Sequence, residues 1–101
     1  MSALSIVESA KGQFTLAGDL NRNTIPQATG LDTSKQLPAD NNTLLLDMTE
    51  VKHTDTAGLA WVMNLLKQAR GQGLECQLKG VPQSLINLAK ISDVDSFLSV
   101  Q

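Results

Sequence analysis

Two apolar patterns of different period meet near the middle of the chain, and they predict a strand followed by a helix. Residues 43–47 (Thr-Leu-Leu-Leu-Asp) form an apolar run with the length of a buried strand, and we expect it to be central and covered on both sides. From Leu59 to Arg70 the apolar residues recur at helical spacing. The predicted stripe consists of Leu59, Val62, Met63, Leu66 and Ala69. Trp61 and Leu65 are expected toward one edge of that stripe.

Three other segments have the pattern of strands. Residues 5–8 and 13–17 are predicted to form an antiparallel hairpin around a turn at residues 10–12, which ends in a glycine. The period of two places Phe14 and Leu16 on one face of the second strand. Residues 74–79 alternate between apolar and polar side chains and are predicted to form the fourth strand.

Two further segments have weaker helical patterns. A helix is predicted from about Ile25 to Gln36, with Thr24 and Gln27 as a capping box. A short last helix is predicted to open with Pro82 at its first position. Its apolar residues are Leu85, Ile86, Leu88 and Ala89. The order strand-strand-helix-strand-helix-strand-helix predicts the α/β class, with a mixed sheet of about four strands and about three helices.

The polar turn between the central strand and the main helix is the candidate functional site. Asp55 is predicted to be the N-cap, with its carboxylate accepting from the N–H of Ala57 or Gly58. Thr56 then opens the helix and exposes its hydroxyl at an end that favours negative charge. Capping alone would explain Asp55 and Thr56. It does not explain the small residues 56–58, which leave the helix end open to a partner surface or an anion.

Trp61 lies about one helical turn beyond Thr56 and allows two interpretations. It is either a residue at the edge of the core or an exposed aromatic anchor, since tryptophan is enriched among interface hot spots. In the second case Trp61 and Thr56 belong to one partner-binding patch.

Composition narrows the function classes. The 101 residues suffice for one domain, so residues 1–101 are expected to form a single unit. A net charge of −2 without a basic face disfavours nucleic-acid binding. The lone Cys76 excludes an internal disulfide and fits a reducing cytoplasm. The chain has neither a run of about 18 apolar residues nor a signal-peptide pattern, so we expect a cytoplasmic domain that does not insert into the membrane.

Candidate catalytic groups are few. His53 is the only histidine, and a Ser-His-Asp arrangement would have to use it with Asp47 or Asp55, although a lone histidine in a polar turn is usually only solvated. Ligand spacing for a metal and the glycine-rich motifs of nucleotide-binding loops are both missing from the sequence. We therefore expect no catalytic residue, no metal and no cofactor.

Three motifs in order resemble the STAS domain, the family of sulfate transporters and anti-sigma-factor antagonists. They are residues 18–21 (Gly-Asp-Leu-Asn), residues 44–59 from the Leu-Leu-Leu-Asp run to Thr-Asp-Thr-Ala-Gly-Leu, and residues 79–82 (Lys-Gly-Val-Pro). In anti-sigma-factor antagonists, the residue before the glycine of the turn is phosphorylated by a partner kinase. That position is Ala57 here, so the usual phosphoacceptor is missing, and only Thr56 could substitute for it at a shifted site.

The turn is more similar to that of stand-alone MlaB-type STAS subunits. This resemblance implies a non-enzymatic accessory subunit that binds the MlaF-like ATPase of an ABC transporter at the inner membrane. The complex would transport phospholipids and maintain outer-membrane lipid asymmetry, with Thr56 as the functionally important residue of the turn. The alternative is an anti-sigma-factor antagonist that is regulated by a Ser/Thr kinase. For either partner, the expected binding residues are Asp55, Thr56, Ala57, Gly58 and Trp61.

Overall fold

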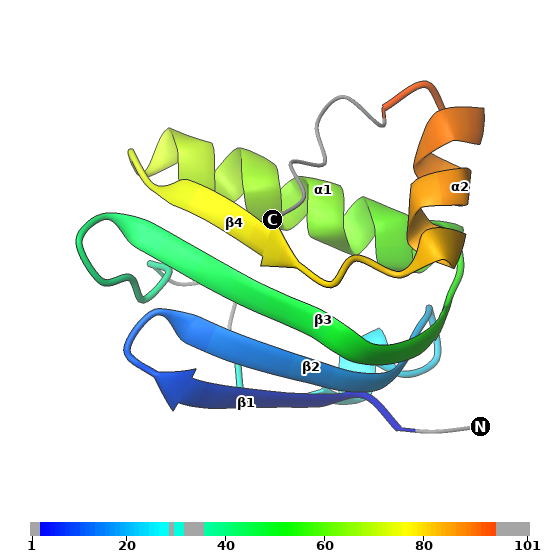
Figure 1. Ribbon diagram of the computed structural model, residues 1–101, viewed down its shortest axis with the longest axis horizontal. Helices are drawn as coiled ribbons and strands as arrows, with labels where there is room; N and C mark the ends of the chain where they lie inside the picture. The colour runs from blue at the N-terminus through cyan, green and yellow to red at the C-terminus, as the bar shows by residue number, and fades with distance from the viewer. Residues whose placement is uncertain (1–2, 29, 32–35, 95–101) are drawn as a thin grey trace.

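The centre of the domain is a mixed β-sheet whose strand order follows the chain (Figure 1). The computed structural model describes residues 3–28, 30–31 and 36–94. Within these, the strands are β1 (Ser5–Ala10), β2 (Gln13–Leu20), β3 (Thr43–Thr54) and β4 (Glu75–Lys79). Strand β1 is antiparallel to β2, whereas β2, β3 and β4 run parallel. The helices are α1 (Thr56–Gly71) and α2 (Gln83–Ile91). The predicted α/β class and mixed four-stranded sheet are therefore confirmed.

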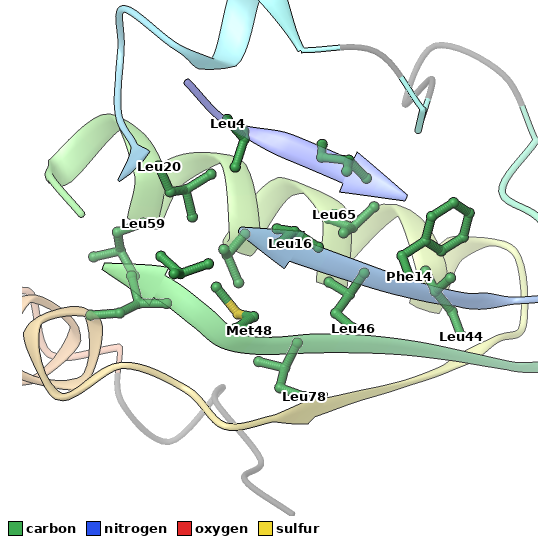
Figure 2. Packing of buried hydrophobic residues seen from close by; sticks show 14 of the residues in the cluster. Leu4, Phe14, Leu16, Leu20, Leu44, Leu46, Met48, Leu59, Leu65 and Leu78 are labelled. Carbon is green, nitrogen blue, oxygen red and sulfur yellow. The ribbon is translucent and has the colours of Figure 1, made fainter. Parts of the chain in front are cut away.

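The core lies between one face of the sheet and helix α1 (Figure 2). Phe14, Leu46 and Leu78 occupy matching positions on β2, β3 and β4, and all three are almost fully buried. On β3 the alternation continues through Met48, whereas Leu45 is only partly buried. The prediction that residues 43–47 are covered on both sides therefore holds fully for one face, whereas the other face is only partly covered. Leu45 points to the other face, where its register neighbours are the polar residues Gln13 and Gln77.

The buried stripe of α1 is rotated from the one predicted. Leu65 is 1% exposed and belongs to the core, whereas Met63 and Leu66 are only partly buried. The fully buried positions Val62, Leu65 and Ala69 follow the spacing of three and four residues. The apolar residues of this helix cover more than half a turn, so the sequence alone did not define the centre of the stripe.

The observed orientation of α1 leads to a prediction about the stability of the domain. We expect Leu65→Ala to lower the free energy of unfolding by about 2–5 kcal/mol, because it opens a cavity in a packed core. Leu66→Ala is the matched control, and its cost is expected to be less than half as large because Leu66 is only partly buried. Urea unfolding of the two variants measures both values. Equal losses would contradict the observed orientation of α1.

The predicted helix from Ile25 to Gln36 is wrong over its described part. Only a 3-10 turn, η1 (Ile25–Gln27), forms, and Ala28 is already extended. Gly30 has a φ of +107°, which a helix does not accommodate. Residues 32–35 lie outside the described residues. The described chain therefore has two helices and this short turn, not three helices.

The predicted capping box does not form either. Thr24 has α-helical dihedral angles, and its side chain makes no capping hydrogen bond. Its buried hydroxyl instead donates to the carbonyl oxygen of Asp19 at 2.7 Å and accepts from the N–H of Asn21 at 3.1 Å. These bonds fix the loop that leaves β2. At the other end of the chain, Pro82 is the N-cap of α2 and not its first helical residue.

Strand β3 is longer than predicted, and this places the turn that follows it. It continues to Thr54, so that Asp19 pairs with His53 and Leu20 with Thr54 in the parallel ladder. The carboxyl ends of β2 and β3 therefore lie together where α1 begins (Figure 1). Of the helices that the structure describes, none has the length and apolar character needed to cross a membrane.

Candidate functional site

Asp55 caps helix α1 as the sequence predicted. Its backbone is extended, and its Oδ1 accepts from the N–H of Gly58 at 2.9 Å. The other carboxylate oxygen accepts from the backbone N–H of Arg22 at 3.4 Å, a contact that the sequence did not indicate. The backbone N–H of Asp55 donates to the carbonyl oxygen of Leu20. Asp55 therefore ties the start of α1 to the loop after β2.

The small residues that follow have different roles. Thr56 is the first residue of α1 and is exposed, while Ala57 is partly buried. Gly58 is buried, and a Cβ at this position would lie 2.4 Å from the carbonyl oxygen of Leu20. Glycine therefore allows α1 to start directly against the end of β2. This packing leaves the Thr56 hydroxyl on the surface of the turn.

Trp61 and the start of α2 complete the surroundings of the turn. Trp61 is partly buried and packs against the core, which matches a position at the edge of the core. The hydroxyl of Thr54 lies 3.1 Å from that of Ser84 and so links the end of β3 to the first turn of α2. The sequence did not indicate this link, because its partners are 30 residues apart.

His53 has a hydrogen-bond partner that is distant in the sequence. Its Nδ1 lies 2.9 Å from Oδ1 of Asp19, although the imidazole is 79% exposed and the Asp19 side chain only 8%. Asp47 and Asp55, the two predicted alternatives, are engaged elsewhere. Asp47 accepts from the hydroxyl and the N–H of Thr49, and these bonds lower the pKa of its carboxyl group. The lone histidine is therefore anchored to a carboxylate and not only solvated.

Cys76, the lone cysteine, lies away from the turn, on the core-facing side of β4. It is register-paired with the buried Leu44 and packs against the core. Burial raises the pKa of the thiol to about 11, so the sulfur is protonated at neutral pH. A protonated thiol is a poor nucleophile and a poor metal ligand. Across residues 3–28, 30–31 and 36–94, no three His, Cys, Asp or Glu residues cluster as metal ligands would.

The capping geometry predicts how Asp55 contributes to stability. Asp55→Ala removes the acceptor for the Gly58 N–H and should lower the free energy of unfolding by about 0.5–2 kcal/mol. Asp55→Asn keeps an oxygen at the same place and should cost much less. Urea unfolding at neutral pH compares the two. A loss as large for asparagine as for alanine would show that the charge matters and not the cap.

The comparisons with known proteins agree with this architecture. No curated protein matches the chain. The family model described as "Mlab, STAS domain" matches residues 7–99, which include all of β2, β3, β4, α1 and α2. Proteins of this family are generally non-catalytic. Since the match covers most of the chain and contains the complete strand-turn-helix unit around Thr56, the chain belongs to the MlaB-type STAS domain family.

Proposed function

We propose that this protein is a non-enzymatic accessory subunit that binds the ATPase subunit of an ABC transporter. In this proposal it supports assembly and activity of a complex that transports phospholipids and maintains outer-membrane lipid asymmetry. The protein is cytoplasmic and is held at the inner membrane through its partner. The family match over residues 7–99 carries the proposal, because MlaB-type membership suggests an accessory role in an ABC transporter.

The proposed docking surface consists of Asp55, Thr56, Ala57 and Trp61, and it is positioned by the buried Gly58. Three features of the turn support it. Thr56 is exposed, the Asp55 carboxylate is already bonded to two backbone N–H groups, and Gly58 fixes the position of the helix end. A polar group on a rigid element loses little conformational freedom when it binds. Thr56 is therefore the central contact of this surface, and Trp61, further along α1, is its proposed apolar contact.

The same turn disfavours signalling by phosphorylation. Ala57 has no hydroxyl at the position that anti-sigma-factor antagonists phosphorylate. A phosphate on Thr56 would gain from the helix dipole but would lie beside the Asp55 carboxylate, whose charge opposes it. An unmodified Thr56 that contacts a partner surface avoids this repulsion.

The test is purification of the tagged full chain from its host in mild detergent, with co-purifying proteins identified and quantified by mass spectrometry. We expect an ABC ATPase and its permease in amounts near those of the tagged chain. The Thr56→Glu variant, purified in parallel, should lose both. Recovery of a kinase-like anti-sigma factor in place of the ATPase, with a phosphate mass shift on the intact chain, would overturn the proposal.

A further inference from the structure

An exposed imidazole is held by a buried carboxylate beside the proposed docking surface. His53 lies two residues before Asp55 and three before Thr56, at the end of β3. Its Nδ1 is 2.9 Å from Oδ1 of Asp19, which lies opposite it in the β2–β3 ladder. We propose that His53 is a specificity-determining contact of the docking surface and that Asp19 is the positioning residue that orients it. This inference rests on the proposed function.

The Asp19 carboxylate determines which hydrogen-bonding group His53 presents. A carboxylate only accepts hydrogen bonds, so the hydrogen of the shared bond belongs to Nδ1 of the imidazole. In the neutral ring, Nε2 then carries a lone pair and accepts. Nε2 lies on the side of the ring away from Nδ1 and therefore away from Asp19. For the neutral ring, the complementary partner group is an N–H or O–H donor on the ATPase.

Burial differs sharply within this pair. The Asp19 side chain is 8% exposed and the His53 side chain 79% exposed, so Asp19 is part of the fixed structure while most of the ring faces outward. Because most of the imidazole is exposed to solvent, its attraction to the carboxylate is screened and contributes little to stability. The hydrogen bond to Asp19 does restrict the rotamers of the imidazole before a partner binds. A side chain that is already oriented loses less conformational entropy on binding. The arrangement resembles the way in which outer carboxylates orient functional histidines.

The position of the pair connects it with Thr56. The turn after His53 is fixed by Thr54, which is linked to Ser84, and by Asp55, which is bonded to Gly58 and Arg22. Because this turn is rigid, the imidazole and the Thr56 hydroxyl keep a constant relative position. We expect one partner surface to contact both of them, because they are exposed and only three residues apart, at the end of β3 and the start of α1. Two fixed polar groups discriminate between partners better than one.

The experiment measures affinity for the ABC ATPase subunit that is recovered with the tagged chain, by calorimetric titration with full-length variants. We expect His53→Ala to weaken binding about tenfold. Asp19→Ala should weaken it less, and Asp19→Asn, which keeps the acceptor, should restore most of the loss. The double variant His53→Ala/Asp19→Ala should bind no more weakly than His53→Ala. The effects of the two substitutions on affinity would then not add up, whereas their effects on the melting temperature should show no such coupling. This combination identifies a positioning role of Asp19 and not a general loss of stability.

A second variant tests whether the partner group donates or accepts the hydrogen bond with His53. Lysine can donate but cannot accept. We therefore expect His53→Lys to bind more weakly than His53→Ala, whereas tighter binding of the lysine variant would overturn the assignment of a donor on the partner. Lys11→Ala, at an exposed position in the turn between β1 and β2, is the matched surface control and should bind like the wild type.

The outcomes separate this inference from the proposed function. If the wild-type chain binds the ATPase and Thr56→Glu abolishes binding, but His53→Ala binds normally, only the inference fails. If Asp19→Ala and His53→Ala lower the affinity additively, His53 contributes without being positioned by Asp19, and the inference also fails. If the wild-type chain does not bind an ABC ATPase at all, the proposed function fails and the inference fails with it.

Discussion

Replacing Gly58 with alanine is expected to destabilise the domain strongly, and replacing it with valine should prevent stable folding. A Cβ at this position would lie 2.4 Å from the carbonyl oxygen of Leu20 and 3.1 Å from its Cγ. The carbonyl cannot move aside easily, because Leu20 is register-paired with Thr54 of β3 and its oxygen accepts from the N–H of Asp55. We expect a loss of about 3 kcal/mol for Gly58→Ala, a large share of the stability of a small domain. The larger valine side chain would add further overlap.

Gly71 is the matched control for this prediction. It is the last residue of the same helix, and a Cβ there would meet no atom within 4 Å. Gly71→Ala should therefore leave stability unchanged or raise it by up to about 1 kcal/mol, because alanine is the better helix former. Urea unfolding of the three variants decides the matter. Equal and small effects at positions 58 and 71 would show that α1 does not pack against β2 as described.

Local signals predicted the part of the site that lies within one turn of chain. Asp55 and Gly58 are three residues apart, so the capping bond between them follows from sequence spacing alone. The hairpin of β1 and β2 and the apolar alternation of β2 were likewise encoded in short stretches. In each case the interacting residues are neighbours in the sequence, and the conformation that they favour locally agrees with the tertiary packing.

The contacts that the sequence did not predict depend on strand register. The pairing of Asp19 with His53 joins residues 34 apart, and it follows register shifts between Thr15 and Ala17 and between Gly18 and Asp19. A shift of one residue would turn either side chain to the other face of the sheet. The steric need for Gly58 also arises only when α1 meets the end of β2. The spacing of residues in the sequence does not indicate contacts of this kind, which depend on how strands and helices pack together.

The incorrect helix from Ile25 shows the opposite problem, a local signal that tertiary contacts override. Thr24 and Gln27 have the spacing of a capping box, but the Thr24 hydroxyl bonds to the backbone of Asp19 and Asn21. Since the chain after Gln27 contains poor helix formers, nothing extends the first turn. The consequence for the site is favourable, because the loop that Thr24 holds carries the Arg22 N–H that bonds to Asp55.

Thr56→Glu is expected to abolish binding of the ABC ATPase, with an affinity loss of about a hundredfold or more, because it places a charged and larger side chain at the centre of the proposed docking surface. Folding should be unaffected, since Thr56 is exposed and an acidic residue at the first position of a helix complements its dipole. Thr56→Ala should cause a smaller loss, and Thr56→Ser, which retains the hydroxyl, should bind almost like the wild type. This ranking distinguishes a contact through the hydroxyl from simple steric exclusion, in which alanine and serine would be equivalent.

Calorimetric titration against the purified ATPase provides the affinities, and thermal unfolding provides the check on folding. Wild-type affinity of a folded Thr56→Glu variant would remove this turn from the interface, and the docking surface would then have to lie elsewhere on the domain.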